Sequence, residues 1–567
     1  MRFFNLIIIL FFLLLVAGCR KDEDISDNTD IEYPSELFIN TSVKGTVKGS
    51  RGFVVTGAVI QIGSVLKTSD FNGYFHFENI STRKSGEVIK VEKPGFRTAY
   101  KTFYPQKDGI IYIDFELVAE TGNIVINTGD NKKLLGNDEA SIEITGNSFV
   151  TDGQDYTGMI QIKPLFAHPD NFDFFEKQFG DPIGYDKYFK TKGLNSFGIV
   201  GIEMFQSGGN KIDLGSTNRA ELRIKNTVTD APVEISVWKY NFEKKKWLET
   251  NDKAKLVSQN GNTYYIAEVK SAGFYNLAQN FDVYEKELTI TSNEGVNAQF
   301  INVGISAQGL NYKLTQRASN QGKIITFLPL NKKSDIAVNL NDKTFTETIK
   351  KEESTIKIPA DHKLITVKGL LKDCSGNPVN KGYITIISNK DTIFFDVDQS
   401  GSFNCNIIDA KNEPKISWMA SDTKNEINTF IHKSIKTDIS DLGEIYVCSE
   451  PFAFVQFGEE KYTLDLKMKD ITSSTLALEF IKGSNKLEIV CLDFKGEKKY
   501  DLNTFPFTFA YNESATKRLF PVGEYQIVVD ECNKPGMIRG TFEGKAKKNF
   551  DDETIRDLKI KYSVRLE

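Results

Sequence analysis

Short runs in which apolar and polar residues alternate recur along most of the chain. In 58–62 the apolar residues Ala58, Ile60 and Ile62 share one face of an extended segment, and in 111–117 every odd position is apolar. The last run, 557–567, again places an apolar residue at every second position. A period of two residues is typical of half-buried β-strands. The pattern therefore predicts an all-β chain, and we expect the final run to be a strand of a β-sandwich.

Two segments of the middle region carry other local patterns. Phe172, Phe175 and Phe179 follow the spacing of one helix face, so we expect a short helix that packs onto a neighbouring sheet rather than lining a ligand site. Residues 236–240 and 246–248 alternate on either side of a polar tip, which predicts a β-hairpin. The three lysines at its tip, 244–246, are interpreted as a solvated turn.

The order of strands and turns near the N-terminus returns later in the chain. The Val-Lys-Gly triplet at 43–45 recurs unchanged at 367–369. The turn and strand that begin at Asp70 are matched by those that begin at Asp398. Residues 320–327 suggest a third, weaker copy. Repeated small β-units, each with its own core, are typical of modular proteins.

Length and composition fit several folded modules. A chain of 567 residues is too long for one hydrophobic core, and 12% aromatic residues argue against disorder. The 71 basic and 76 acidic residues nearly balance, and no segment carries a basic stripe. Nucleic-acid binding normally needs such a stripe, so we expect no nucleic-acid partner.

The first nineteen residues have the pattern of an export signal. Arg2 precedes an apolar run from Leu6 to Val16, which is shorter than the roughly 20 residues of a membrane-spanning helix. The run ends in Ala17-Gly18-Cys19, which resembles a bacterial lipoprotein signal. That resemblance implies cleavage before Cys19 and acylation of its thiol with a palmitate-type chain. The alternatives are a plain signal peptide or a failed membrane helix.

The residues after Cys19 are charged and polar, which indicates a flexible acidic tether. This segment resembles the export signal of surface lipoproteins of the Bacteroidota. The resemblance implies a protein anchored in the cell outer membrane and facing the exterior.

The strand and turn order of 41–119 resembles the carboxypeptidase regulatory-like domain, a transthyretin-like β-sandwich that is not itself catalytic. The region with the two tryptophans at 238 and 247 resembles the middle domain of large Bacteroidota lipoproteins and extracellular segments of cartilage intermediate layer proteins. Both resemblances imply tandem transthyretin-like or Ig-like β-sandwiches. The expected segments are a signal peptide at 1–18, lipidated Cys19 and a tether at 19–40, and β-modules at 41–119, 120–284, 285–360, 361–450 and 451–567.

Besides Cys19, five cysteines occur, all in the last two hundred residues: Cys374, Cys405, Cys448, Cys491 and Cys532. They form no CxxC pair, and the four histidines are scattered, so a zinc site has no local support. Disulfides suit an exported protein, although buried free thiols are the alternative. Sandwiches of the regulatory-like family imply that the strands ending near Cys374 and Cys448 run side by side, so we expect these two to be joined. Cys491 and Cys532 are then the remaining candidates, and Cys405 belongs to a core face.

No catalytic motif stands out. GxSxG, HExxH and Walker A patterns are absent from the sequence. Oxygen ligands near Asp70 or in Asp396-Val397-Asp398 could hold calcium, but turn aspartates are the simpler interpretation. His76 points away from the apolar face of its strand, so we expect a solvated side chain. The sequence gives no reason to expect a cofactor or a metal.

We therefore expect a surface-exposed lipoprotein of the outer membrane that acts as a binding or structural protein and not as an enzyme. Its partners would be the outer-membrane lipid, through Cys19, and an unidentified glycan or protein ligand. Two alternatives stay open. One is a hydrolase of glycans or peptides, and the other is an envelope-assembly partner that faces the periplasm.

Overall fold

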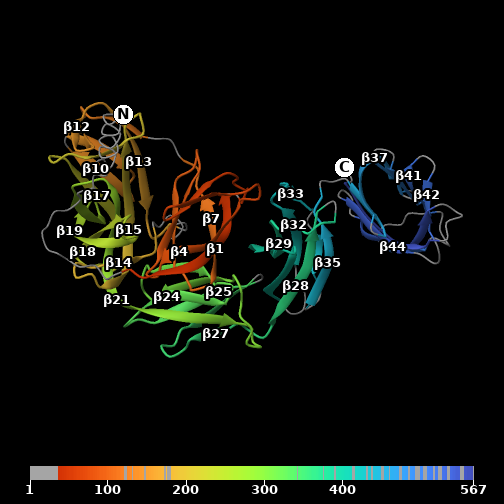
Figure 1. The fold of residues 1–567 in the computed structure, drawn as a ribbon. Helices are drawn as coiled ribbons and strands as arrows, with labels where there is room; N and C mark the ends of the chain where they lie inside the picture. The colour runs from red at the N-terminus through yellow and green to blue at the C-terminus, as the bar shows by residue number, and fades with distance from the viewer. Residues whose placement is uncertain are drawn as a thin grey trace, which may run out of the picture. The chain divides into compact units, whose positions relative to one another are not determined.

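The computed structural model describes residues 36–50, 52–120, 124–130, 132–145, 148–171, 174, 180–340, 343–373, 376–388, 391–410, 416–429, 432–435, 439–448, 452–458, 460–471, 476–482, 485–491, 498–501, 507–514, 517–521, 526–532, 537–548 and 554–565. The elements of this part are all β-strands, so the prediction of an all-β chain is confirmed (Figure 1). Residues 38–567 form one compact unit, separate from residues 1–37. Cys19, the signal and the tether lie outside the described residues. No helix in the described part is long and apolar enough to cross a membrane.

The first module is a sandwich of two sheets. One sheet has the order β4-β1-β7, in which β1 is antiparallel to β4 and parallel to β7, and the other has the order β3-β2-β5-β6. Both sheets contribute apolar side chains to one core, in which Ala58 and Ile60 are fully buried. The strands are β1 (Phe38–Gly49), β2 (Val59–Ile62), β3 (Val65–Thr68), β4 (Tyr74–Arg83), β5 (Glu87–Glu92), β6 (Ala99–Phe103) and β7 (Ile110–Leu117).

The same strand order occurs twice more. In the third module β21 is antiparallel to β24 and parallel to β27, and in the fourth module β28 is antiparallel to β31 and parallel to β35. The third module contains β22 (Asn302–Ala307), β23 (Lys313–Arg317), β24 (Lys323–Pro329), β25 (Ser334–Asn339), β26 (Thr344–Thr348) and β27 (Thr355–Lys357). The fourth contains β28 (His362–Lys372), β29 (Gly382–Ser388), β30 (Asp391–Asp396), β31 (Ser402–Ala410), β32 (Ile416–Asp422), β33 (Ile427–Asn428), β34 (His432–Ile435) and β35 (Ile439–Tyr446).

One turn is common to all three copies and explains a repeated glycine. Gly73, Gly322 and Gly401 have φ of 74°, 72° and 81°, a left-handed conformation that costs glycine little. The carbonyl of each accepts a hydrogen bond from the central strand, donated by the amides of Val47, Ile290 and Leu371 at 2.8, 2.7 and 2.8 Å. A side chain at these positions would also come within 2.5–2.8 Å of the same strand's carbonyl oxygen. The weak sequence match at 320–327 is therefore the same turn and strand.

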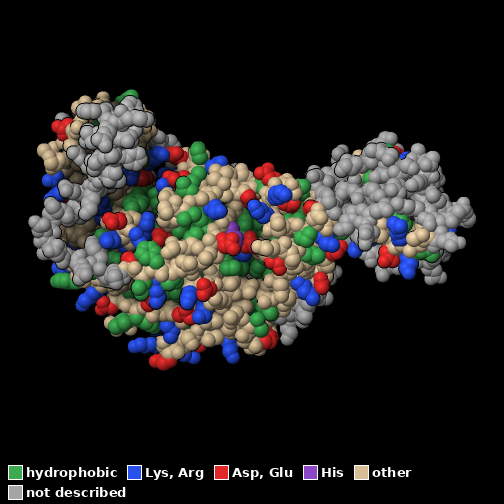
Figure 2. Space-filling view, in the orientation of Figure 1, with side chains coloured by type: hydrophobic (Ala, Val, Ile, Leu, Met, Phe, Trp, Pro, Cys, Tyr) green, Lys and Arg blue, Asp and Glu red, His purple; other side chains and the backbone are tan. Residues whose placement is uncertain are grey.

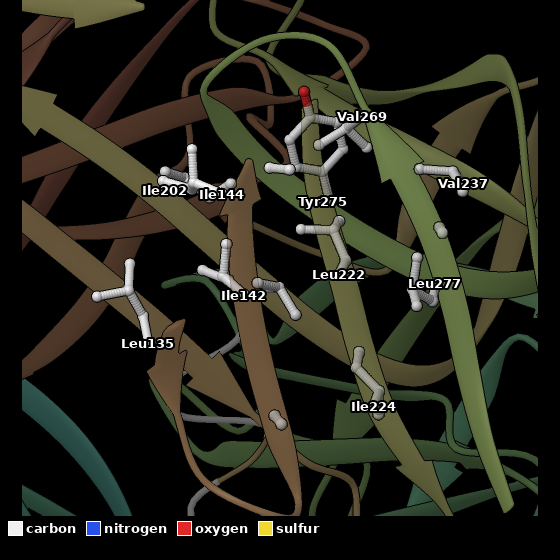
Figure 3. Close-up of a cluster of buried hydrophobic side chains, with 14 of the residues drawn as sticks. Leu135, Ile142, Ile144, Ile202, Leu222, Ile224, Val237, Val269, Tyr275 and Leu277 are labelled. Atoms are coloured by element: carbon white, nitrogen blue, oxygen red, sulfur yellow. The ribbon is translucent and has the colours of Figure 1, made fainter. Parts of the chain in front are cut away.

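The strands of the middle region belong to one continuous hydrogen-bonded sheet that surrounds a large core, and this sheet shares a strand with the third module. Its long strand β21 (Gly273–Thr291) pairs first with β15 and β18 and then with β24, so it crosses the boundary predicted at 284. Figure 3 shows apolar side chains of β10, β15, β17, β18 and β21, such as Ile142 and Leu222, directed into one core. The other strands are β8 (Ile124–Asn127), β9 (Lys132–Gly136), β10 (Ala140–Thr145), β11 (Phe149–Thr151), β12 (Gln154–Tyr156), β13 (Met159–Ala167), β14 (Ile183–Tyr185), β15 (Thr191–Phe205), β16 (Lys211–Leu214), β17 (Arg219–Asn226), β18 (Glu234–Asn241), β19 (Lys246–Gln259) and β20 (Asn262–Val269).

Two local predictions fall in this region. The hairpin is present as β18 and β19, but its lysines are not a solvated turn, because Lys246 is only 4% exposed and Lys244 and Lys245 are half-buried. Lys246 begins β19 and lies over the rings of Tyr104 and Phe327. The predicted helix with Phe172, Phe175 and Phe179 lies outside the described residues.

The last region differs from the sandwich expected there. Its strands form one sheet, and β44 pairs with β42 and β43 along one edge and with β45 along the other, so the sheet closes on itself. The alternation predicted for β45 is present, with Leu558, Ile560 and Val564 buried. The strands are β36 (Phe452–Phe457), β37 (Glu460–Ile471), β38 (Leu476–Lys482), β39 (Asn485–Cys491), β40 (Lys498–Asp501), β41 (Phe507–Ser514), β42 (Lys517–Pro521), β43 (Gln526–Cys532), β44 (Met537–Lys548) and β45 (Arg556–Arg565).

Candidate functional site

The structure brings three of the sequence-selected residues, Asp70, His76 and Asp396, to a single junction between the first and fourth modules. Asp70 and His76 flank the start of β4, and Asp396 ends β30. Asp398 does not join them, because its carboxylate accepts hydrogen bonds from Ser400 and Ser402 in its own turn. The junction is therefore the candidate site that the sequence-selected residues define.

Asp396 is the centre of a charged cluster. Its carboxylate accepts a hydrogen bond from the Tyr74 hydroxyl at 2.5 Å and forms an ion pair with Lys44 Nζ at 3.2 Å. Lys44 is only 3% exposed and lies over the rings of Phe300 and Phe395. Burial raises the pKa of Asp396, but the charge of Lys44 and the contact with His76 outweigh it and hold the pKa below its ordinary value. The carboxylate therefore stays ionised near neutral pH.

His76 does not have the solvated side chain that the sequence predicts. Its imidazole is 28% exposed, and Nδ1 lies 3.6 Å from the Asp396 carboxylate. Burial lowers the pKa of His76, although Asp396 opposes this, so the ring is neutral near pH 7. The prediction fails because the outward face of β4 is covered by the fourth module instead of by water.

A second group of polar contacts continues the junction. The Asn72 side chain donates to the Tyr383 hydroxyl at 2.7 Å and exchanges hydrogen bonds with Asn428 at 2.9 and 2.8 Å. The Tyr383 hydroxyl in turn donates to Asp70 at 2.8 Å. Asp70 also accepts from the amides of Asn72 and Tyr74, so it is a turn residue whose oxygens are used by protein donors. Burial raises its pKa despite these hydrogen bonds.

Arg317 of the third module ties the first and fourth modules together. Its guanidinium binds Asp391 through two hydrogen bonds, at 2.5 and 2.8 Å, and Asp114 through Nε at 2.8 Å. Its side chain is 7% exposed and lies over the ring of Tyr112. Burial works against the charge of Arg317, but the two aspartates outweigh it and raise the pKa further. Nothing in the alternation of β23 distinguishes this arginine from a solvated one.

These groups are arranged to hold modules together. The charged and hydroxyl groups at Asp396, Tyr383 and Arg317 have protein partners, and planar guanidinium–carboxylate pairs of this kind give geometric specificity. Among the described residues, no group of three or more His, Cys, Asp or Glu side chains is placed to hold a metal ion. Oxygens of Asp70 and Asp398, the calcium candidates, already accept protein hydrogen bonds.

A smaller junction, which the sequence analysis missed, joins the first module to the middle region. The Asp181 amide donates to the Thr102 hydroxyl at 3.3 Å, and the Asp181 carboxyl faces Tyr104 and Lys246. Burial raises the pKa of Asp181 to about 6, although Tyr104, Lys246 and Lys101 oppose this shift. The one available signal was the unbroken lysine run before Trp247, which we interpreted as solvated.

The cysteines are only partly described. Cys448 is disulfide-bonded, whereas Cys405 is a free, buried thiol, and Cys374 lies outside the described residues. The strands that precede Cys374 and Cys448 run side by side and parallel, and the Val447 amide donates to the Lys372 carbonyl at 2.8 Å. Cys491 and Cys532 end β39 and β43, which are not neighbours in the sheet.

We therefore predict a disulfide between Cys374 and Cys448. Parallel strand ends at adjacent positions bring two Cα atoms within the roughly 4.4–6.8 Å that a disulfide needs. Mass spectrometry of the unreduced, digested protein should yield a peptide that links these two residues. A free thiol at Cys374, or a peptide linking Cys374 to Cys405, would contradict the prediction.

No family model matches the chain, and no curated protein matches it. The resemblances to the regulatory-like domain and to the lipoprotein middle domain therefore stay predictions from the sequence. Solved structures to which the chain is similar include a protein of unknown function from Bacteroides fragilis that is described as putatively membrane-associated. It is 11% identical, covers 44% of this chain and 100% of its own, and has a TM-score of 0.13.

Two pilins are similar at the same level. A streptococcal ancillary pilin is 8% identical, covers 39% of this chain and 94% of its own, and has a TM-score of 0.13. BcpA, the major pilin subunit of Bacillus cereus, is 10% identical, covers 72% of this chain and 99% of its own, and has a TM-score of 0.12. TM-scores this low carry no argument about function.

Proposed function

We propose that this protein is a surface-exposed outer-membrane lipoprotein, anchored through acylated Cys19, which acts as a non-catalytic binding or structural protein. The observation that carries the proposal is the apolar run that ends in Ala17-Gly18-Cys19. Acyl chains contribute about 0.8 kcal/mol per buried CH₂, so two or more chains hold a protein stably at a membrane.

The junctions support the structural part of the proposal. Charged side chains such as Asp396 and Arg317 form ion pairs with residues of other modules in this chain and so join the modules. Such contacts are expected in a structural protein. On the face drawn in Figure 2, basic and acidic side chains are mixed among apolar ones wherever the side chains are described. Where its side chains are described, this face therefore shows no large patch of only basic or only acidic residues.

Replacement of the anchor residue tests the proposal. Cys19→Ala should leave the protein uncleaved or release it from the membrane fraction, because an alanine cannot be acylated. Gly18→Ala is the matched control, because it keeps a small residue before the cysteine, and it should stay acylated and membrane-bound. Fractionation with immunoblotting, together with the mass of the mature N-terminus, gives the readout. A Cys19→Ala protein that is cleaved and still membrane-bound would contradict the lipid anchor.

A further inference from the structure

His76 is a titratable side chain that lies between the first and fourth modules. It projects from β4 of the first module, and its Nδ1 lies 3.6 Å from the Asp396 carboxylate of the fourth module. Its Nε2 is buried and has no hydrogen-bond partner among the described residues. One nitrogen of the imidazole therefore faces a carboxylate of another module, while the other is enclosed and unsatisfied within the described part of the chain.

Lys44 lies directly opposite His76 in the sheet. The two residues are paired in register across β1 and β4, where opposed Cβ atoms are about 4.5–5.5 Å apart. Asp396 is the counter-charge of Lys44, at 3.2 Å, and the other oxygen of that carboxylate accepts from the Tyr74 hydroxyl. A proton on His76 therefore places a second cation beside Lys44, and the two cations share one carboxylate. Like charges directly opposite each other on a sheet are destabilising.

Two further charges face His76, and they have opposite signs. Glu78 follows on the same strand and Lys67 comes from β3, and both are exposed. Burial has the largest influence and lowers the pKa of His76; Lys44 and Lys67 also lower it, whereas Asp396 and Glu78 raise it. The net shift is downward, so the folded chain binds a proton at His76 less readily than the unfolded chain does.

From this geometry we infer that the His76 junction is an acid-sensitive contact between the first and fourth modules, which opens when His76 binds a proton. Protonation makes Nε2 a donor where the described residues offer no acceptor, and it sets a second positive charge opposite Lys44. Both costs disappear when the outward face of β4 separates from the fourth module, because water then hydrates the imidazolium. The inference concerns contacts within the folded chain and does not depend on the lipid anchor, so the two can fail separately.

The direction and the pH range of the effect follow from the same group. The ordinary pKa of histidine is 6.5, and the pKa of His76 in the folded chain is lower. Well above pH 6.5 the imidazole is neutral in both the closed and the open junction, so pH does not affect the contact. As pH falls below 6.5 the open junction binds the proton first, and the closed junction loses stability. An imidazole in water is protonated about ten to one at pH 5.5, so the open population should rise by up to about tenfold there.

Hydrogen–deuterium exchange of the purified full chain at pH 7.5 and pH 5.5 tests the inference. The protection factors of amides in β4 and β30 should fall by up to about tenfold at pH 5.5 and recover when the sample is returned to pH 7.5. His76→Gln keeps a polar side chain that does not titrate, so it should abolish the fall. If His76→Gln does not fold, His76→Phe takes its place, because its ring fills a similar space and cannot bind a proton.

His168→Gln is the matched control, because it removes a buried imidazole of the middle region whose Nε2 has a partner, the Lys225 carbonyl at 2.7 Å. This variant should show the same fall in β4 and β30 as the wild-type protein. In Lys44→Met the opposing charge is absent and Asp396 can pair with protonated His76, so the fall should be smaller. The inference is overturned if the protection factors are the same at both pH values, if the His76 variant retains the fall, if His168→Gln abolishes it, or if Lys44→Met leaves it as large as in the wild type.

Discussion

Arg317→Met is expected to lower the free energy of unfolding by about 3 kcal/mol, because it leaves two partly buried carboxylates without their counter-charge. Asp391 and Asp114 both bind the guanidinium, and Arg317 itself is 7% exposed. Methionine keeps most of the packing against Tyr112, so the loss of stability measures the contribution of the Arg317 charge. Because the three partners come from three modules, we expect hydrogen exchange to accelerate together in β7, β23 and β30.

Urea denaturation and hydrogen–deuterium exchange of the full chain measure this effect. Lys343→Met is the matched control, because Lys343 and Asp361 form an ion pair in which both side chains are about half exposed. Exposed pairs contribute little, so this variant should change stability only slightly. Adding Asp391→Asn to Arg317→Met should recover part of the loss. Equal effects of Arg317→Met and Lys343→Met would contradict the proposed role of the Arg317 junction.

Stability should also depend on the protonation of Asp181. Its pKa is raised from an ordinary 3.8 to about 6, chiefly by burial. Below pH 3.8 the carboxyl is protonated in both the folded and the unfolded chain, so its burial does not lower the free energy of unfolding. Above pH 6 it is ionised in both states, and the folded state then carries a cost of up to about 3 kcal/mol. The stability contributed by this group therefore falls as pH rises from about 4 to about 6.

Asp181→Asn removes the titrating carboxyl and tests the predicted dependence of stability on pH. The variant should be as stable as the wild-type protein near pH 4 and more stable than it at pH 7.5, as measured by urea denaturation at both values. Asp155→Asn makes the same chemical change at an exposed position and is the control. If the difference between Asp181→Asn and the wild type does not grow with pH, or grows equally for Asp155→Asn, the account of this junction is wrong.

Strands and turns could be predicted from the sequence because they depend on local alternation and on residues such as Gly73, whose backbone conformation is unusual. The junctions could not. Alternation shows which side chains point away from a module's own core, but not what covers that outward face. Tyr112 occupies such a position and is 1% exposed, because it packs against Phe300 of the third module. His76 and Lys246 were misjudged for the same reason.

The closed sheet of the last region has a similar explanation. Each strand there alternates as a sandwich strand would, with Leu558 and Ile560 on the buried side. Whether such strands divide into two sheets or curl into one depends on which strands pair. Here β44 pairs with β45, the next strand in the chain, and β36 pairs with β45 from the opposite end of the region. Pairing over that sequence distance leaves no local pattern.

Exposure of the β-modules on the outside of intact cells tests the proposed function most directly. Cells that express the wild-type protein would be treated with proteinase K and blotted with an antibody against residues 361–448, with a periplasmic protein as the control for membrane integrity. We predict that the full-length band disappears while the periplasmic control stays intact. Survival of the full-length band until the outer membrane is permeabilised would contradict a surface-exposed lipoprotein.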